Sequence, residues 1–271
     1  MGAASLRIGL IYAITGVMLL PIVWMVGTSL KPPLEYVSTT VDLIPDAPTL
    51  AHYRALWADD ILGKVLNSLI VATGATLIAL AAGFPAAYAL ARLRLPRRLD
   101  GVFLIFVLVV KLSPPLVLAI PLYQVLRTIG LLDTLPGLIL VYQVYCLPFA
   151  IWMLLGFVRD VPIAYEDAAR IEGAGLARRL ATIVLPLITP GLVATAVFLM
   201  ILCWNEFAYA LLFIQTPSKF TLPTYIATLI TEDETFWGQL TAIGFLASLP
   251  ILALVGIVQR GLTRGFAGGL K

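Results

Sequence analysis

The sequence predicts an all-α integral membrane protein with six transmembrane helices and a long polar segment, residues 161–187, between the fourth and fifth. Of its 271 residues, 61% are hydrophobic and only 12% are charged, which is far outside the usage of soluble globular proteins. The apolar residues gather in six long runs, and the polar segment is charged, glycine-containing and flanked by two of them. A membrane protein with such a segment is expected to present it to something soluble.

A helix that spans a bilayer needs about 20 apolar residues at a rise of about 1.5 Å each. Spans are therefore expected at residues 8–30, 66–91, 101–125, 135–158, 187–214 and 239–258. The first run is too long for the apolar part of a signal peptide, and no small-residue cleavage site follows it, so we expect it to stay as an anchor. The six spans form one domain, residues 1–271.

The distribution of basic residues predicts the orientation, because cytoplasmic loops carry an excess of Lys and Arg. With the N-terminus inside, twelve basic residues lie in cytoplasmic segments: Arg7, Arg92, Arg94, Arg97, Arg98, Arg159, Arg170, Arg178, Arg179, Arg260, Arg264 and Lys271. Only five lie outside: Lys31, Arg54, Lys64, Arg127 and Lys219. Both termini and residues 161–187 are thus expected in the cytoplasm of a multi-pass plasma membrane protein.

Residues 161–187 have the local features of two short helices. Pro162 suits the first turn of a helix, and Glu166 and Arg170 form an i, i+4 pair of opposite charge. Gly173 and Gly175 interrupt the first helix, and a second run leads to Pro186. By local physics alone, this segment is equally well an amphipathic loop on lipid headgroups.

The spacing within this segment is more specific. It contains Asp-Ala-Ala, then Gly after three residues, Ile after nine more and Leu-Pro after one, which are Asp167, Ala168, Ala169, Gly173, Ile183, Leu185 and Pro186. The pattern resembles the cytoplasmic signature of ABC importer permeases, which begins Glu-Ala-Ala. Here Asp167 replaces that glutamate and Glu166 directly precedes it. The resemblance implies that Glu166 and these seven residues dock on an ATPase subunit, as the coupling helix does in that family.

Further stretches resemble the carbohydrate-uptake branch of these permeases, in particular the smaller permease of maltose-type systems. They are 30–32, 168–174, 204–207 and 261–271. The resemblance implies an importer for a sugar or related polyhydroxy solute in a bacterial or archaeal plasma membrane. Its expected partners are a second permease, a dimeric P-loop ATPase, an external solute-binding protein and membrane lipid. No cofactor is expected in this chain, and ATP and Mg are expected on the ATPase.

Polar residues inside the predicted spans are candidates for the substrate path. A lysine near the middle of a span costs roughly 2.5–3.5 kcal/mol on insertion scales, so Lys111 is expected to face protein or water. Aromatic faces and amides suit sugar rings and hydroxyls, and the candidates are Lys111, Tyr123, Gln124, Tyr142, Gln143, Trp204, Asn205 and Glu206. The alternative is that they join helices and form an interfacial aromatic belt. A stripe of Ala75, Ala79, Ala82 and Ala86 predicts close helix packing.

Several function classes lack support in the sequence. No G-x-x-x-x-G-K-[ST] loop is present, so this chain is not expected to bind ATP, and no hydrolase motif indicates an intramembrane enzyme. The basic residues form no run of the kind that binds nucleic acid. Cys146 and Cys203 lie in apolar runs without paired spacing and are expected to be buried thiols. The remaining alternative is an ion-coupled secondary carrier or channel, with Lys111 and Glu206 as its coupling pair.

Overall fold

The computed structural model describes residues 2–32, 35, 45–93, 97–230 and 236–268. The long helices are α1 (Gly2–Ser29), α3 (Ile61–Arg92), α6 (Leu135–Asp160), α9 (Leu185–Trp204) and α12 (Trp237–Gly268). The shorter ones are α2 (Ala51–Ala58), α4 (Arg97–Leu112), α5 (Pro115–Thr128), α7 (Ile163–Ile171), α8 (Leu176–Arg179), α10 (Ala208–Phe213) and α11 (Leu222–Thr228). A π-helical turn, η2 (Leu180–Val184), joins α8 to α9, and a 3₁₀ turn, η3 (Pro217–Lys219), precedes α11.

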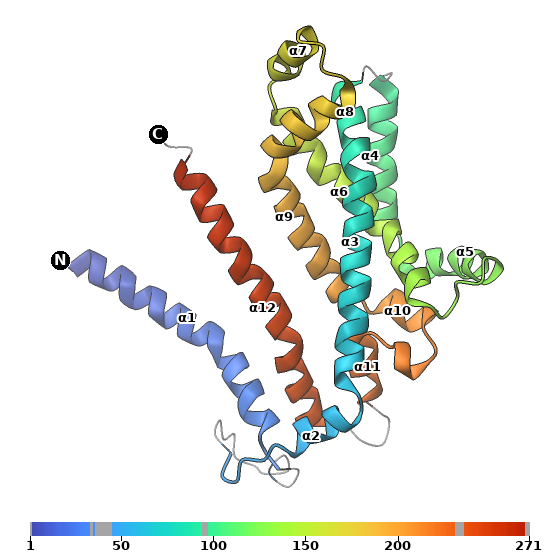
Figure 1. Ribbon diagram of the computed structural model, residues 1–271. Helices are drawn as coiled ribbons and strands as arrows, with labels where there is room; N and C mark the ends of the chain where they lie inside the picture. Colours follow the sequence, from blue (N-terminus) through green and yellow to red (C-terminus); the bar gives the residue numbers. More distant parts are fainter. Residues whose placement is uncertain (1, 33–34, 36–44, 94–96, 231–235, 269–271) are drawn as a thin grey trace.

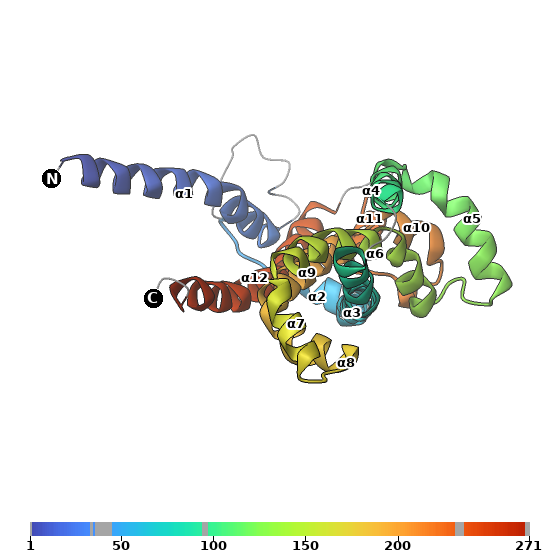
Figure 2. The same ribbon diagram turned by 90° about the horizontal axis from the view of Figure 1, so that it is seen from above.

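Within the described residues, five helices are long and apolar enough to cross a membrane. The third expected span, residues 101–125, is wrong as one continuous helix, because α4 ends at Leu112 and α5 begins at Pro115. The break has a local cause: proline disfavours helical backbone at the residue before it and lacks an N–H, and Pro114 and Pro115 follow each other here. In Figures 1 and 2, α5 runs away from α4 at a steep angle.

The expected span 187–214 also differs from the structure. The helix begins earlier, since α8, η2 and α9 run continuously from Leu176, and it ends at Trp204. The Glu206 carboxylate then accepts the backbone N–H groups of Tyr209 at 2.9 Å and Ala210 at 3.2 Å. Because the first N–H groups of a helix have no partner within it, this side chain starts α10 as a separate helix.

The core of the bundle is the contact between α3 and α6. Side chains four residues apart form ridges on a helix, and such ridges pack into the grooves of a neighbouring helix. On α3 the buried ridge is Val71, Ala75, Ala79, Gly83 and Ala87. On α6 it is Leu138, Tyr142, Cys146, Ala150, Leu154 and Val158. Both ridges are continuous over most of the helix length, so α3 and α6 form one packed unit.

The expected alanine stripe is right for Ala75 and Ala79, and Ala86 packs against the buried cluster around Ala87, whereas the expectation is wrong at Ala82. Ala82 is exposed and Ala86 is half-buried, because the contact follows four-residue steps around the helix through Gly83 and Ala87. A methyl group added at Gly83 would lie 2.9 Å from the Cβ of Ala150. The absence of a side chain at Gly83 therefore sets the close approach of α3 and α6.

Helix α9 completes the packed unit. A methyl group at Gly191 would lie 2.3 Å from the ring of Phe157 on α6. Further along the same contact, the Sγ atoms of Cys146 and Cys203 lie 3.2 Å apart. The expectation of buried thiols is confirmed, and the structure adds that the two thiols meet across the α6–α9 contact.

Helix α1 extends away from this packed unit, whereas α12 packs against its lower end, where Ala242 and Ile243 join Trp204 of α9 in a second buried cluster. Every described side chain of α1 from residue 6 to residue 24 is exposed. Figures 1 and 2 show α1 diverging from the bundle, with α12 as the helix beside its lower end. Only the last turn of α1 is buried, where Ser29 Oγ lies 2.8 Å from the hydroxyl of Tyr53 near α2. Most of the apolar surface of α1 is thus left uncovered by the described chain.

The two ends of the bundle differ. In Figure 1, α7 and α8 lie at the upper end with the last turn of α3 and the start of α4, and α2 and α11 lie at the lower end. Near the lower end, Asp133 joins the turn before α6 to the segment after α10. Its carboxylate accepts the backbone N–H groups of Gln215 and Thr216 at 2.9 and 3.1 Å, and lies 3.0 Å from Lys219 Nζ.

Candidate functional site

Residues 161–187 form a helical hairpin at the upper end of the bundle. Helix α7 ends at Ile171, and Gly173 follows with a φ of +83°, a backbone conformation that glycine adopts without a steric cost. The chain then turns into α8 and η2, which lead directly into α9. The first short helix expected from the sequence is present and ends at the expected glycine break, whereas the second helical run is the start of the continuous helix that leads into α9.

One side of α7 faces the bundle, and its main contact is Glu166. This side chain is 4% exposed. One carboxylate oxygen lies 2.7 Å from Arg92 Nε, and the other accepts the hydroxyl of Tyr88 at 2.5 Å. The expected Glu166–Arg170 pair is wrong, because α7 turns Glu166 towards α3. Arg170 instead lies 3.7 Å from Asp167, where both side chains are exposed.

The other side of the hairpin is open. Asp167, Ala168 and Gly173 are exposed, and their neighbours Ile163, Tyr165, Ile171 and Leu176 are large apolar residues that are 52–88% exposed. Ala169 and Ile183 are half-buried, and Leu185 and Pro186 are exposed at the start of α9. The signature residues are therefore spread over the hairpin, with most of them on its open side and Glu166 directed inward.

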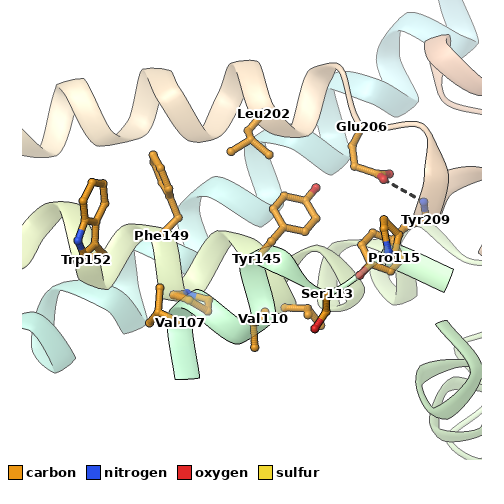
Figure 3. A pocket seen from close by; sticks show the side chains of 12 residues that line it. Val107, Val110, Ser113, Pro115, Tyr145, Phe149, Trp152, Leu202, Glu206 and Tyr209 are labelled. Carbon is orange, nitrogen blue, oxygen red and sulfur yellow. Dashed lines mark hydrogen bonds between the residues drawn. The ribbon is translucent and has the colours of Figure 1, made fainter. Parts of the chain in front are cut away.

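A second candidate site is a cavity of about 570 Å³ between α4, the start of α5, α6, α9 and α10. Figure 3 shows the side chains that line it: aromatic rings follow one side of α6, and the carboxylate of Glu206 lies near the end of α9. The rings are those of Tyr145, Phe149 and Trp152. Tyr145 also stacks on Tyr209 with ring centroids 6.1 Å apart. The cavity thus combines aromatic faces with a carboxylate.

Of the eight residues expected on a substrate path, Glu206 lines this cavity. Tyr142 is fully buried, and Gln143 donates to the backbone oxygens of Ala75 and Ile139 at 3.1 and 3.0 Å. Gln143 thereby joins α6 to α3, and Tyr142 packs in the buried core beside Tyr145, with ring centroids 5.5 Å apart.

Four of the remaining five make other contacts or are exposed, and the side chain of the fifth is not described. Trp204 donates to the Ala247 oxygen at 3.2 Å and Asn205 to the Ile201 oxygen at 2.8 Å. Tyr123 packs near Phe213, and Gln124 is exposed on α5. Lys111 belongs to α4, and its side chain lies outside the described part of the structure.

Sequence reasoning missed the aromatic wall of the cavity. Tyr145, Phe149 and Trp152 lie at i, i+4 and i+7 along α6, a spacing that places side chains on one face of a helix. This signal was present in the sequence. Tyr209 and Ser113 could not be found in this way, because each reaches the cavity only through a break in an expected span.

Comparison with known proteins gives the family. Residues 79–268 match the family described as "Binding-protein-dependent transport system inner membrane component". The trehalose transport system permease protein SugB of Mycobacterium tuberculosis is 36% identical over 94% of this chain and 93% of that protein. The sulfoquinovosyl glycerol transport system permease protein SmoH of Agrobacterium fabrum is 34% identical over 93% of this chain and 89% of that protein.

The fold agrees with the sequence match. A chain in the crystal structure of a bacterial ABC transporter involved in import of the acidic polysaccharide alginate superposes with a TM-score of 0.77. The superposition covers 96% of this chain and 98% of that chain at 20% identity. From its sequence match and helical fold, this chain belongs to the binding-protein-dependent transport system inner membrane components, which are the permease subunits of ABC importers.

Proposed function

We propose that this permease imports a sugar or a related polyhydroxy solute, and that residues 161–187 couple it to a dimeric P-loop ATPase. The observation that carries the coupling is the open side of the α7–α8 hairpin. It exposes Ile163, Ile171 and Leu176 beside Asp167. Exposed apolar residues with a polar rim are typical of protein–protein contacts. ATP and Mg bind to the ATPase, and the small side chains of Ala168 and Gly173 let its surface approach closely.

The path of the chain supports a cytoplasmic position for the hairpin. Helix α3 rises to the upper end of the bundle and α6 rises there again (Figure 1), so α4 returns the chain between them. With 16 residues, α4 covers about 24 Å, most of a hydrocarbon core of about 30 Å. Counting α4 gives six crossings, and an even number leaves both termini on the same side of the membrane. The excess of basic residues on the side of the hairpin supports the cytoplasmic assignment.

The relatives and the cavity support a carbohydrate substrate. SugB and SmoH are named for the transport of trehalose and of sulfoquinovosyl glycerol, and both of these solutes carry sugar rings. Sugar rings pack against aromatic faces and their hydroxyls donate to carboxylates. The cavity offers the faces of Tyr145, Phe149 and Trp152 together with Glu206, so we assign it to the substrate path.

Two further partners complete the proposed transporter. The exposed apolar side chains of α1 exceed what a monomer leaves exposed to water, and they fit lipid or a second, different permease. An external solute-binding protein then delivers the substrate. In the cycle that we propose, closure of the ATPase dimer moves the hairpin, the helices rock as bodies and the substrate path opens alternately to each side.

The test is purification of the full chain from its native membrane in mild detergent, with partners identified by mass spectrometry. We expect a second permease and a P-loop ATPase, and the binding protein recovered with them can be screened against sugars. In a matched preparation, Gly173→Val is expected to insert in the membrane and to lose the ATPase, because Gly173 has a φ of +83°. Recovery of the chain alone, from membranes that transport without ATP, would instead establish a carrier.

A further inference from the structure

Glu166 and Asp167 are adjacent carboxylates with opposite surroundings. The Glu166 side chain is 4% exposed and lies against Tyr88 and Arg92, whereas that of Asp167 is 54% exposed. Successive residues on a helix differ by about 100° in direction, so a surface that binds Asp167 leaves Glu166 in place. Glu166 is therefore available for a role within the chain while the open side of the hairpin binds its partner.

The partners of Glu166 belong to the last turn and a half of α3. Arg92 makes a second contact with the hairpin, since its NH2 group donates to the Val161 backbone oxygen at 2.6 Å. One arginine thus holds both the first residue of the hairpin and the middle of α7. Tyr88 directly follows the buried ridge of α3, which packs along α6 to Val71.

This arrangement makes a direct mechanical path from the hairpin into the bundle. The contact between α7 and α3 consists of directed charge-assisted hydrogen bonds, which are short and geometrically specific. The contact between α3 and α6 is close-packed, and close-packed interiors transmit displacement. A displacement of α7 is therefore passed to α3 and α6 together, rather than being absorbed in a flexible loop.

We propose that Glu166 is a positioning residue that fastens the hairpin to α3 through Arg92 and Tyr88, so that movement of the docked ATPase is converted into movement of the α3–α6 unit. The proposal rests on the coupling function proposed above. It assigns the two neighbouring acids separate tasks: Asp167 faces the partner, and Glu166 transmits the movement.

The charges around Glu166 make this joint dependent on its carboxylate. Arg179 is 8% exposed, its Nε and one terminal nitrogen have no hydrogen-bond partner, and its charge acts on Tyr88. Among the described contacts of this cluster, Glu166 supplies the one acidic group. Removing its charge leaves Arg92 without an anion, with the Val161 backbone oxygen as its described partner, while the charge of Arg179 acts on the same tyrosine. Removing the anion from a largely buried cation is strongly disfavoured.

The experiment uses the complete transporter with its partners, reconstituted in lipid. Movement is read from a cysteine at Ser113, which lines the cavity, in a chain with Cys146→Ala and Cys203→Ala. The probe is a membrane-impermeant maleimide, and the measured quantity is the change in labelling rate when ATP is added. ATP hydrolysis and the amount of co-purified ATPase are measured in parallel.

We expect Glu166→Gln to keep the ATPase bound and hydrolysing ATP, while the ATP-dependent change in labelling falls by about tenfold. Tyr88→Phe, which removes a single hydroxyl, is expected to reduce the ATP-dependent change in labelling by a smaller factor. The charge-reversed pair Arg92→Glu with Glu166→Arg is expected to recover a large part of the response that each single change loses. Asp160→Asn is the matched control, because it makes the same chemical change at an exposed position six residues away.

An unchanged labelling response in both Glu166→Gln and Tyr88→Phe would overturn the proposal. So would a loss of ATPase binding in Glu166→Gln, since that result would place Glu166 on the docking surface. If Glu166→Gln does not insert in the membrane, Tyr88→Phe decides between these outcomes. The proposed function itself would be contradicted if the transporter without the Glu166 or Tyr88 substitution contains no ATPase, or if its labelling at position 113 does not respond to ATP.

Discussion

At the scale of single residues, the structure repeatedly uses one carboxylate to hold two segments together. Glu206 accepts two backbone N–H groups at the start of α10, and Glu166 joins α7 to α3. Asp133 does the same outside the spanning helices, at a backbone φ of 56°. Burial by itself raises the pKa of Asp133, but the hydrogen bonds from Thr216, Gln215 and Lys219 outweigh it and hold the pKa well below its usual value of 3.8.

The Asp133 contacts give a prediction for stability and pH. Asp133→Asn is expected to lower the free energy of unfolding by about 1–3 kcal/mol at pH 7, because hydrogen bonds to a charged group are lost. A pKa that is lower in the folded state stabilises the fold above the unfolded pKa, and this contribution disappears as pH falls through the folded pKa. The difference in free energy of unfolding between Asp133→Asn and the parent should thus stay constant from pH 8 to pH 5 and shrink below about pH 4.

Thermal unfolding in detergent, followed over this pH range, measures the difference. Asp160→Asn serves as the control, because Asp160 is exposed at the end of α6. Equal stability of Asp133→Asn and the parent at pH 7 would show that the Asp133 contacts do not hold the lower end of the bundle together.

The sequence could not separate the two acids at 166 and 167. The sequence shows that Asp167 occupies the first position of the signature and that Glu166 precedes it, so both are expected on the docking surface. Which of two adjacent residues faces inward depends on the rotation of α7 about its axis. That rotation is set by Tyr88 and Arg92, which lie more than 70 positions earlier in the chain.

At the scale of the elements, Gly83 and Gly191 determine how closely α3 and α9 pack against α6, because neither carries a side chain. Gly83→Ala is expected to destabilise the protein by about 1–3 kcal/mol, because the new methyl group overpacks the contact with Ala150. Gly156→Ala on α6 is the matched control, since no atom lies within 4 Å of the added methyl. Both changes replace a helical glycine by the better helix former. The difference in unfolding temperature between the two variants therefore measures the effect of overpacking alone. Equal effects of the two substitutions would contradict the ridge contact.

The α6–α9 contact can be tested through its two thiols. Treatment of membranes with diamide, a permeant azo oxidant that takes one hydrogen from each thiol, is expected to join Cys146 and Cys203 in an intramolecular disulfide. Peptide mass spectrometry after alkylation identifies the product, and Cys203→Ala should abolish it. Recovery of both cysteines in alkylated form would place α6 and α9 further apart than they are here.

Element boundaries show what hydropathy predicts well and where it fails. The lengths of α3 and α6 follow from continuous apolar composition, and the predicted spans lie within both helices. The breaks at Ser113 and Glu206 were missed because neither changes hydropathy enough to end an apolar run. The adjacent prolines at 114 and 115 were a readable stop signal. The capping of α10 by Glu206 was not, because it depends on the helix break itself.

At the scale of the whole molecule, the chain has one packed unit, a helix α12 that packs against its lower end, and a helix α1 that extends away from it. The unit of α3, α6 and α9 holds the cavity on one side and the hairpin at its upper end (Figures 1 and 3). The class of protein could be predicted, since composition, positive charge distribution and the spaced signature each depend on local sequence. The cavity could not, because its walls come from five helices whose contacts are far apart in the chain.

The cavity yields the prediction that tests the substrate path at this scale. Trp152 is 53% exposed, and its ring contributes to the cavity wall rather than to the buried ridge of α6. Trp152→Ala is therefore expected to leave the fold and the bound ATPase unchanged. The loss of one aromatic contact, about 0.5–1.5 kcal/mol, should raise the KM for uptake of the sugar selected by the binding protein by roughly two- to tenfold.

Trp57→Ala is the matched control, because Trp57 is a similarly exposed tryptophan on α2, at the opposite end of the bundle from the hairpin (Figure 1). Uptake and ATP hydrolysis are measured together in reconstituted transporters. A higher KM with ATP hydrolysis intact places Trp152 on the route of the solute, because a defect in coupling would lower the transport rate at every solute concentration. An unchanged KM in Trp152→Ala would remove the cavity from the substrate path and leave the aromatic wall as a contact for lipid or for the second permease.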